Sequence, residues 1–230
     1  MSPIDLRNPG RSIHVGVILF NSVTEHLDIA PAGYFSTLSK DFLDHAPPEL
    51  LPEEFKPLAL DIVYHWVTED GKTPATLTGN LKVLPTDSFE TCPTLDIVLI
   101  GALVGQYQVS ETEKAFLRKA YEDSTALLLV CGGFQPALAA GLLEGKTATA
   151  PRPILSTVKK LAPGVNWVEK RYVRDGKIWT TGSLLNGLDM VAAFGRETWG
   201  GKRFLVDDFV PEGAWPDRDV DYKDAAEWKI

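Results

Sequence analysis

The stretch ALLLVCGGFQPALAAGLL, residues 126–143, decides the expected fold. An apolar run of strand length ends at Cys131, two glycines follow, and a helical pattern then continues towards Gly145. A continuous apolar run is typical of a strand buried in a parallel sheet, and the paired glycines indicate a sharp turn of the backbone. The stretch therefore predicts a strand–turn–helix unit with Cys131 at the turn.

Cys131 has the placement of a nucleophile elbow, in which small neighbours leave one side chain exposed at the carboxyl end of a sheet. The helix that begins there directs amide groups and the positive end of its dipole at the sulfur, which favours the thiolate. The alternative interpretation is an unreactive cysteine packed at the end of a strand. The placement favours the reactive cysteine.

Strands and helices are expected to alternate on both sides of this unit. Apolar runs predict further strands at 13–20, 58–67 and 95–101, and helical patterns are present at 29–38, 111–123, 153–161 and 184–199. Ser110 and Glu113 form a capping box, and Asp175-Gly176 predicts a hairpin turn. This alternation predicts an α/β protein with a mostly parallel central sheet that is covered by helices on both faces.

Composition narrows the classes of partner. The chain has 230 residues, 44% hydrophobic and 23% charged, with a formal net charge of -8. Its length suits a single domain over residues 1–230, with a core at about 13–200 and a C-terminal extension at about 201–230. The negative charge does not favour nucleic acid or an anionic membrane as partner, and no apolar run predicts a membrane span.

The cysteine and histidine content bears on location and on metals. Cys92 and Cys131 are the two cysteines, which excludes a disulfide framework and favours a cytoplasmic location. The N-terminus lacks the apolar core of a signal peptide. The four histidines have no zinc-ligand spacing, so we expect neither a metal nor another cofactor. His26 is interpreted as a surface histidine of a loop rather than a site residue.

Functional residues are expected at the carboxyl ends of the strands. Asp28 follows the first strand, Gly101-Ala102 the middle strand, and Cys131 the next strand. A carboxyl group near a cysteine can hydrogen-bond the sulfur or move a proton, although Asp28 could instead be a plain helix cap. The amides after Gly101 and Cys131 suggest an oxyanion hole, for which the candidate residues are Gly101, Ala102, Gly132 and Gly133.

The sequence resembles the ThiJ/PfpI superfamily. The resemblance covers about residues 13–200 and rests on VGVILF at 15–20, LDIAP at 27–31, DIVLIG at 96–101, CGG at 131–133 and LAAGLL at 138–143. It implies a flavodoxin-like three-layer α/β/α sandwich and a homodimer. The acidic, aromatic segment from Asp207 to Ile230 is a candidate interface or lid, and the alternative is a tail that packs on its own domain.

The residue at position 28 points to one branch of the superfamily. Glyoxalase-like and protein-repair-like members hold a Glu there, whereas isocyanide (isonitrile) hydratases hold an Asp. Leu27-Asp28 followed by Pro31 therefore resembles the hydratases more closely. The resemblance implies a small-molecule substrate and no cofactor, with Cys131 attacking the isocyanide carbon to give a thioimidate. Asp28 would donate the proton and activate the water.

Three departures from the family pattern keep alternatives open. Pro151 stands where many members carry a His, Gly132 where hydratases carry a hydroxyl residue, and Ile100-Gly101-Ala102 replaces Pro-Gly-Gly. One alternative is a regulatory or non-catalytic protein whose Cys131 senses oxidation by becoming sulfenic or sulfinic acid. Glyoxalase-like action on methylglyoxal is a further alternative, which Asp28 and Pro151 disfavour.

Overall fold

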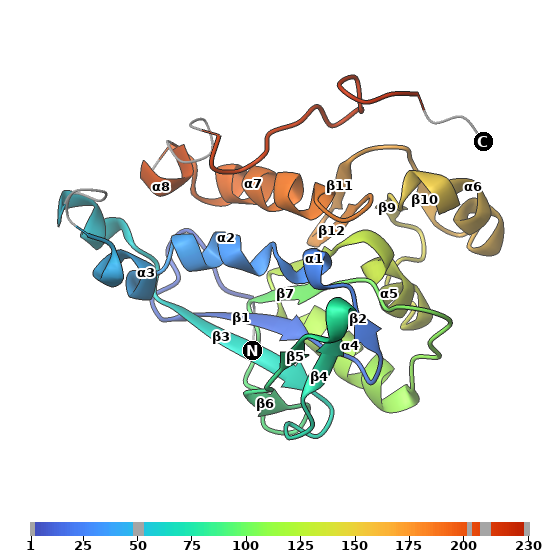
Figure 1. Ribbon diagram of the computed structural model, residues 1–230, viewed down its shortest axis with the longest axis horizontal. Helices are drawn as coiled ribbons and strands as arrows, with labels where there is room; N and C mark the ends of the chain where they lie inside the picture. Colours follow the sequence, from blue (N-terminus) through green and yellow to red (C-terminus); the bar gives the residue numbers. More distant parts are fainter. Residues whose placement is uncertain (1–2, 48–52, 202–203, 208–212, 228–230) are drawn as a thin grey trace.

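The computed structural model describes residues 3–47, 53–201, 204–207 and 213–227. A seven-stranded sheet forms its centre (Figure 1). In spatial order the strands are β11 (Tyr172–Asp175), β12 (Ile178–Thr181), β8 (Ala126–Leu129), β7 (Ile97–Ile100), β1 (Ile13–Ile18), β3 (Ile62–Thr68) and β6 (Asp87–Ser88). β11 and β12 pair antiparallel, and the remaining neighbours pair parallel.

The central strands are parallel because each is apolar on both faces. Every residue of β7 and β8 is buried, and in β1 only His14 is partly exposed. Ile97 of β7 lies opposite Val15 of β1 on one side and Ala126 of β8 on the other. Strands of this kind need cover on both faces, which the connecting helices supply.

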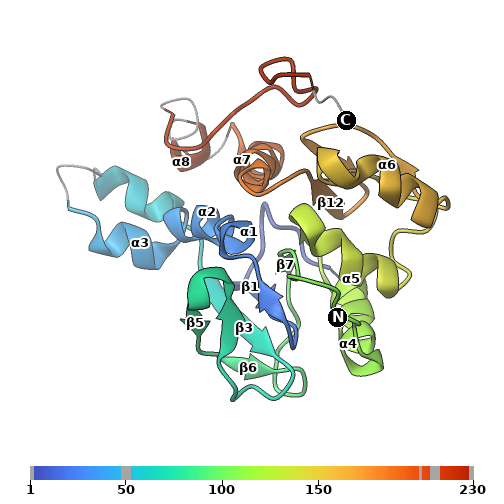
Figure 2. The same cartoon turned by 45° about the vertical axis from the view of Figure 1, so that its right-hand side comes forward.

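Two hydrophobic clusters occupy the two faces of the sheet. Alternate residues of β1 point to opposite sides, so that Val15 and Val17 belong to one cluster and Ile18 to the other. The first cluster packs against α1 (His26–Ile29), α2 (Ala32–Thr37) and α7 (Asn186–Trp199). The second packs against α4 (Glu111–Asp123), α5 (Phe134–Ala139) and α6 (Arg152–Leu161). Figure 2 shows α4 and α5 across β7 from α1 and α2, which confirms the predicted three-layer sandwich.

Several smaller elements lie outside the central sheet and its main helices. They are the helices α3 (Lys40–His45) and α8 (Phe204–Asp207), the 3-10 turns η1 (Glu53–Leu58), η2 (Thr78–Asn80) and η3 (Cys131–Gly133), the strands β2 (Val23–Thr24), β4 (Ala75–Leu77) and β5 (Lys82–Val83), and the pair β9 (Thr147–Ala148) and β10 (Asn166–Trp167). In the part of the chain that the structure describes, no helix has the length and apolar character needed to cross a bilayer.

Local sequence signals account for most element boundaries. The capping box of α4 is present, with Ser110 Oγ accepting from the Glu113 amide at 3.2 Å and Glu113 Oε2 accepting from the Ser110 amide at 2.8 Å. The Asp175-Gly176 hairpin joins β11 to β12. The helix expected at 29–38 is instead two helices, because Pro31 has no N–H to continue α1 and stands at the N-cap of α2.

The chain order of the strands reverses between β1 and β7. From β1 the chain moves to β3 and β6 on one side of the sheet, and it then returns to β7 on the other side of β1. Ligands of open α/β sheets bind at the carboxyl ends of the strands where the order reverses in this way. In this protein, that position lies between the segments that follow β1 and β7.

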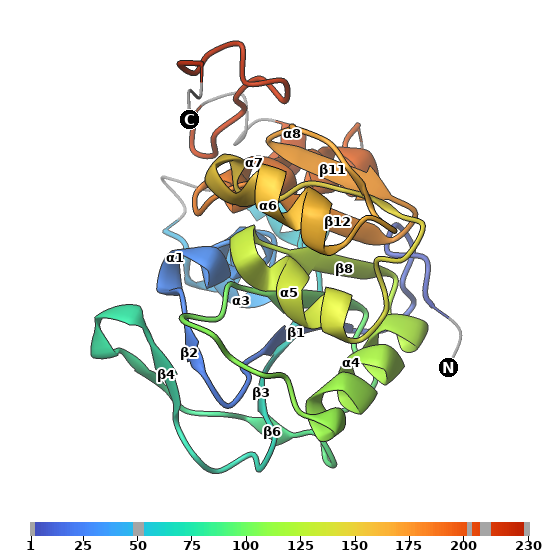
Figure 3. The same ribbon diagram turned by 90° about the vertical axis from the view of Figure 1, so that its right-hand side faces the viewer.

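The C-terminal extension packs against its own domain in residues 213–227, as Figure 3 shows on the outer side of α7. Trp215 packs edge-on against Tyr34 of α2, with ring centroids 5.0 Å apart. Arg218 pairs with the buried carboxylate of Asp189 in α7 at 2.6 Å. Of the two expectations for this extension, these contacts fit the packed tail. Trp228 lies outside the described residues.

Candidate active site

Cys131 occupies the predicted elbow. β8 ends at Leu129, and Cys131 opens the short turn η3 that leads into α5. Its φ of +56° lies in the left-handed region, which a residue other than glycine adopts only when its surroundings hold it there. The strained backbone turns the cysteine out of the strand direction at the carboxyl end of the sheet, as in other nucleophile elbows.

Close packing against β7 holds this elbow. A Cβ on Gly133 would lie 2.3 Å from the carbonyl oxygen of Ile100, so the turn approaches the neighbouring strand more closely than any larger residue allows. The amide of Gly133 donates to Val130 at 2.8 Å, and the amide of Cys131 donates to Thr181 Oγ1 at 3.2 Å. Gly133 is therefore required for packing, and its amide is already engaged.

Asp28 lies in α1, just beyond β1, and is completely buried. The cap of α1 is Glu25, whose side chain accepts from the amide of Leu27 at 3.1 Å, so the interpretation of Asp28 as a plain helix cap is wrong. Asp28 Oδ2 instead accepts from the amide of Ala102 at 2.9 Å. Oδ1 is buried and has no partner of hydrogen-bond geometry among the described residues, which leaves it available to the thiol.

Gly101 makes the room that Asp28 occupies. A Cβ on Gly101 would lie 2.9 Å from the Cβ of Asp28 and 3.1 Å from Cγ2 of Thr24. The glycine that ends β7 therefore allows α1 to bring its carboxyl group against the edge of the sheet. Its function is steric, and this differs from the predicted contribution to an oxyanion hole.

The predicted oxyanion hole is not present in the expected form. The amide of Ala102 donates to Asp28, and the amide of Gly133 donates to Val130. The amide of Gly132 does act on the site, because it lowers the pKa of the Cys131 thiol. A second amide with this effect belongs to Leu184, which the sequence analysis did not single out.

Leu184 shares the unusual backbone of Cys131. Its φ is +47°, again left-handed for a residue other than glycine, in the loop between β12 and α7. No side-chain chemistry marks this position, because the contribution comes from the backbone N–H. The sequence therefore holds no signal that singles out this position.

The thiol and the carboxyl group form an interacting pair. Burial is the main cause that raises the pKa of Asp28 to about 7, and the Ala102 amide and the neighbouring Cys131 thiol oppose this effect. Burial also raises the pKa of the Cys131 thiol to about 11, and the negative charge of Asp28 adds to this increase. The expectation of a thiolate with a lowered pKa is therefore wrong, because burial and Asp28 outweigh the two amides.

Asp28 is only partly ionised at pH 7, and one proton remains on the pair at pH values between the two pKa values. Since the pKa of Asp28 is the lower of the two, the first proton leaves the carboxyl group, and the remaining proton stays on the sulfur. Once Asp28 is ionised, the pair is a thiol beside a carboxylate. Such a pair has a nucleophile and a base in place, and the base has a pKa matched to neutral pH.

Comparison with known proteins identifies the family. The model of the DJ-1/PfpI family matches residues 51–197, a range that contains Cys131 and ends within α7. The chain belongs to the DJ-1/PfpI family. The range does not contain Asp28, so the family match bears on the cysteine elbow and not on its carboxylate partner.

Two kinds of relative support the assignment. An isonitrile hydratase of Pseudomonas putida is 34% identical over 145 residues, which are 61% of this chain and 61% of that protein. A ThiJ/PfpI family protein from Pseudomonas syringae superposes with a TM-score of 0.69 at 18% identity, covering 90% of this chain and 77% of that chain. Drosophila melanogaster DJ-1beta superposes with a TM-score of 0.65 at 17% identity, covering 89% of this chain and 98% of that chain. The two structures show the same fold.

Two departures from the family pattern are physically linked. A Cβ on Gly132 would lie 3.0 Å from the Cβ of Ala102, a distance at which one of the two residues must move. Ala102 is larger than the expected glycine, and Gly132 is smaller than the expected hydroxyl residue. The two changes therefore compensate each other in volume. At the third departure, Pro151 stands at the N-cap of α6.

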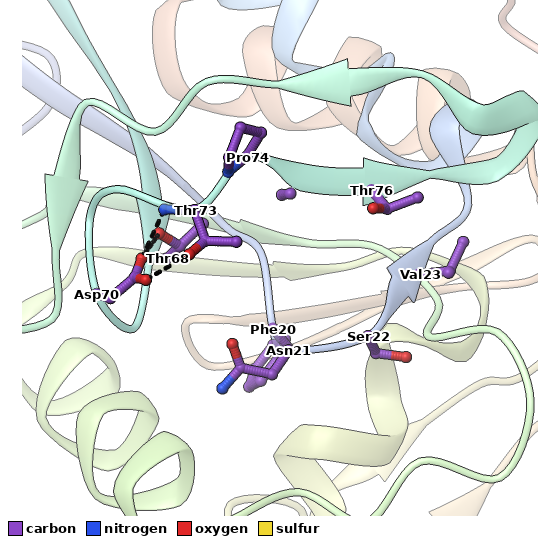
Figure 4. A pocket seen from close by; sticks show the side chains of 10 residues that line it. Phe20, Asn21, Ser22, Val23, Thr68, Asp70, Thr73, Pro74 and Thr76 are labelled. Atoms are coloured by element: carbon purple, nitrogen blue, oxygen red, sulfur yellow. Dashed lines mark hydrogen bonds between the residues drawn. The ribbon is translucent and has the colours of Figure 1, made fainter.

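Other candidate groups lie away from the pair. His26 is exposed and its Nδ1 hydrogen-bonds Thr78 Oγ1 at 2.7 Å, as expected for a surface histidine. A surface pocket of about 390 Å³ at the ends of β1 and β3 includes Asn21 and Asp70 (Figure 4). Asp70 accepts from the amide and the hydroxyl of Thr73 at 2.9 and 2.6 Å, so its carboxylate is occupied. Among the described residues, no cluster of side chains suits a metal ion.

We predict that limiting iodoacetamide at neutral pH labels Cys131 before Cys92. Burial raises the pKa of Cys92 to about 12, above that of Cys131, and Cys92 Sγ donates to the carbonyl of Pro93 at 3.4 Å. The thiolate is the reacting form, so the more ionised thiol should react first. Peptide mass spectrometry after partial labelling measures the ratio. Preferential labelling of Cys92 would overturn the assignment of the reactive cysteine.

Proposed function

We propose that the protein is a cysteine-dependent hydratase that converts isocyanides to N-substituted formamides. The observation that carries the proposal is the buried carboxylate of Asp28, held by the Ala102 amide beside a cysteine at an elbow. The similarity to an isonitrile hydratase supports the same chemistry. The aligned region covers 61% of that relative, so the substrate is part of the proposal.

In the first step, Cys131 Sγ bonds to the isocyanide carbon. Asp28 takes the thiol proton as the carbon–sulfur bond forms, and it then delivers that proton to the same carbon. The product is a thioimidate, R–N=CH–S–Cys131. The proton moves through a group whose pKa is about 7, so neither transfer has to create a strong acid or a strong base.

In the second step, water adds to the thioimidate carbon. Asp28, ionised again, takes a proton from the water as its oxygen attacks, and the proton passes to the nitrogen. The tetrahedral adduct R–NH–CH(OH)–S–Cys131 then breaks its carbon–sulfur bond, and the hydroxyl proton returns to the sulfur. The formamide R–NH–CHO leaves. The amides of Gly132 and Leu184 stabilise negative charge on the departing sulfur.

The alternatives receive less support. An oxidation sensor needs a cysteine that is a thiolate at neutral pH, whereas burial and Asp28 raise the pKa of Cys131 to about 11. Glyoxalase-like action was already disfavoured by Asp28 and Pro151, and none of the contacts at the elbow favours it. We therefore retain hydration of a small electrophilic substrate as the function.

We predict that Asp28→Asn lowers isocyanide turnover at least about a hundredfold, the usual scale for a lost general acid or base. Asparagine retains an oxygen for the Ala102 amide, so the fold should persist.

In the wild type, kcat/KM should fall as the pH drops below about 7, because protonated Asp28 cannot accept the thiol proton. Formamide release, followed by chromatography, measures both effects.

Two controls accompany this experiment. Cys131→Ala should abolish turnover, and His26→Gln, an exposed change in the same helix, should leave turnover near the wild-type rate. Near-normal activity of Asp28→Asn would rule out the acid–base role. A wild-type protein that converts no isocyanide would rule out the hydratase assignment.

We also propose that the protein is a cytoplasmic homodimer. Both cysteines are free thiols, which suits a reducing compartment. Large apolar side chains remain exposed in the single chain, among them Leu84 at 73% and Leu161 at 76%. Multi-angle light scattering should give twice the mass of the chain at micromolar concentration. A mass of one chain across that range would contradict the dimer.

A further inference from the structure

We propose that the C-terminal strap, residues 213–227, is a positioning element of the active site that holds the 182–186 loop against Cys131 and so sets the reactivity of its thiol. The strap crosses the outer side of α7 towards β11 and α6 (Figure 1). The inference rests on the proposed function only in taking Cys131 as the reacting group. It applies to any electrophile that the cysteine attacks.

Thr181 joins the 182–186 loop to the elbow. Thr181 Oγ1, at the end of β12, accepts from the amide of Cys131 at 3.2 Å and donates to the carbonyl of Gly182 at 2.9 Å. Two residues further on, Leu184 is held at a φ of +47°, and its backbone amide lowers the pKa of the Cys131 thiol. A backbone in this region relaxes unless its surroundings hold it. The loop therefore needs an external support.

The strap supplies that support through hydrogen bonds to the loop. Tyr222 Oη accepts from Asn186 Nδ2 at 3.0 Å, and Arg218 Nη2 donates to the carbonyl of Leu185 at 3.1 Å. A Cβ on Gly182 would lie 2.3 Å from Tyr222 Oη, so the glycine admits the tyrosine. Both ends of the loop are thus in contact with the strap.

Arg171 connects the strap to the loop, because its side chain hydrogen-bonds residues of both. The residue is 3% exposed, and its guanidinium donates to Asn186 Oδ1 at 3.1 Å, Asp224 Oδ1 at 2.6 Å and the carbonyl of Asp219 at 2.9 Å. Its own carbonyl accepts from the Gly182 amide at 2.9 Å. The ring of Tyr222 lies 4.7 Å from the guanidinium. A buried cation depends strongly on such partners, so the loop and the strap are coupled.

None of these strap residues supplies a group that interacts with the sulfur. The titratable group that faces the sulfur is Asp28 of α1, and the other interacting groups are the amides of Gly132 and Leu184. The strap therefore acts through the loop. Weakening the strap should release Leu184, remove one amide from the sulfur and make the thiol harder to ionise.

The test compares strap variants of the full chain by the pH dependence of Cys131 alkylation. Tyr222→Ala removes both the hydroxyl and the ring over Arg171, and Tyr222→Phe removes only the hydroxyl. We expect Tyr222→Ala to slow alkylation at neutral pH at least about threefold, with the midpoint of the pH profile moved upward and the limiting rate at high pH unchanged. Tyr222→Phe should give an intermediate change.

The matched control is Asp221→Asn, the neighbouring residue of the strap. It removes an ion pair with Lys170 whose side chains are 42% and 44% exposed, and such pairs contribute little. Its alkylation profile should match that of the wild type. If Tyr222→Ala does not fold, Tyr222→Phe decides.

Strap variants that fold and keep the wild-type profile would overturn the inference, whatever the isocyanide assay shows. If the wild type converts no isocyanide but Tyr222→Ala still alters alkylation, the proposed function fails and the strap inference stands.

Discussion

The site depends on the burial of one carboxyl group beside one thiol. Asp28 is completely buried, and one of its oxygens is fixed by the Ala102 amide at 2.9 Å. Burial makes the negative charge costly, which raises the pKa of Asp28 to about 7 and that of Cys131 to about 11. Asp28 therefore gains and loses its proton near neutral pH, while the thiol beside it keeps its own proton. The two groups meet because Gly101 and Gly133 allow close packing and because the strand order reverses between β1 and β7.

The fold follows from local signals that agree with one another. The apolar runs of β1, β7 and β8, the capping box at Ser110 and the Asp175-Gly176 turn all act over short distances in the sequence. Because strands and helices alternate, a parallel sheet covered by helices on both faces buries the apolar side of every element. The division of the helix at Pro31 was less predictable. The same local sequence fits a proline in the first turn of one helix and a proline between two helices.

The candidate site was predictable in its side chains but not in its backbone. Cys131 and Asp28 carry chemistry that marks them, and the sheet topology brings them together. The amide of Leu184 could not be found, because its contribution needs a left-handed backbone and no particular side chain. The oxyanion prediction assigned Ala102 and Gly133 to the substrate, whereas tertiary packing commits their amides to Asp28 and Val130. The direction in which the thiol pKa shifts also depends on burial, which a sequence motif does not reveal.

The most direct measurement is the titration of Cys131 by the ultraviolet absorbance of its thiolate. The comparison uses Cys92→Ser protein, in which Cys131 alone titrates among the cysteines, with and without Asp28→Asn. Asparagine removes the negative charge that raises the pKa of the thiol but can still accept from the Ala102 amide. Because the charge of Asp28 raises the thiol pKa, we predict that this pKa falls in Asp28→Asn, even though turnover is lost. A thiol pKa that is unchanged or higher in Asp28→Asn would contradict the account.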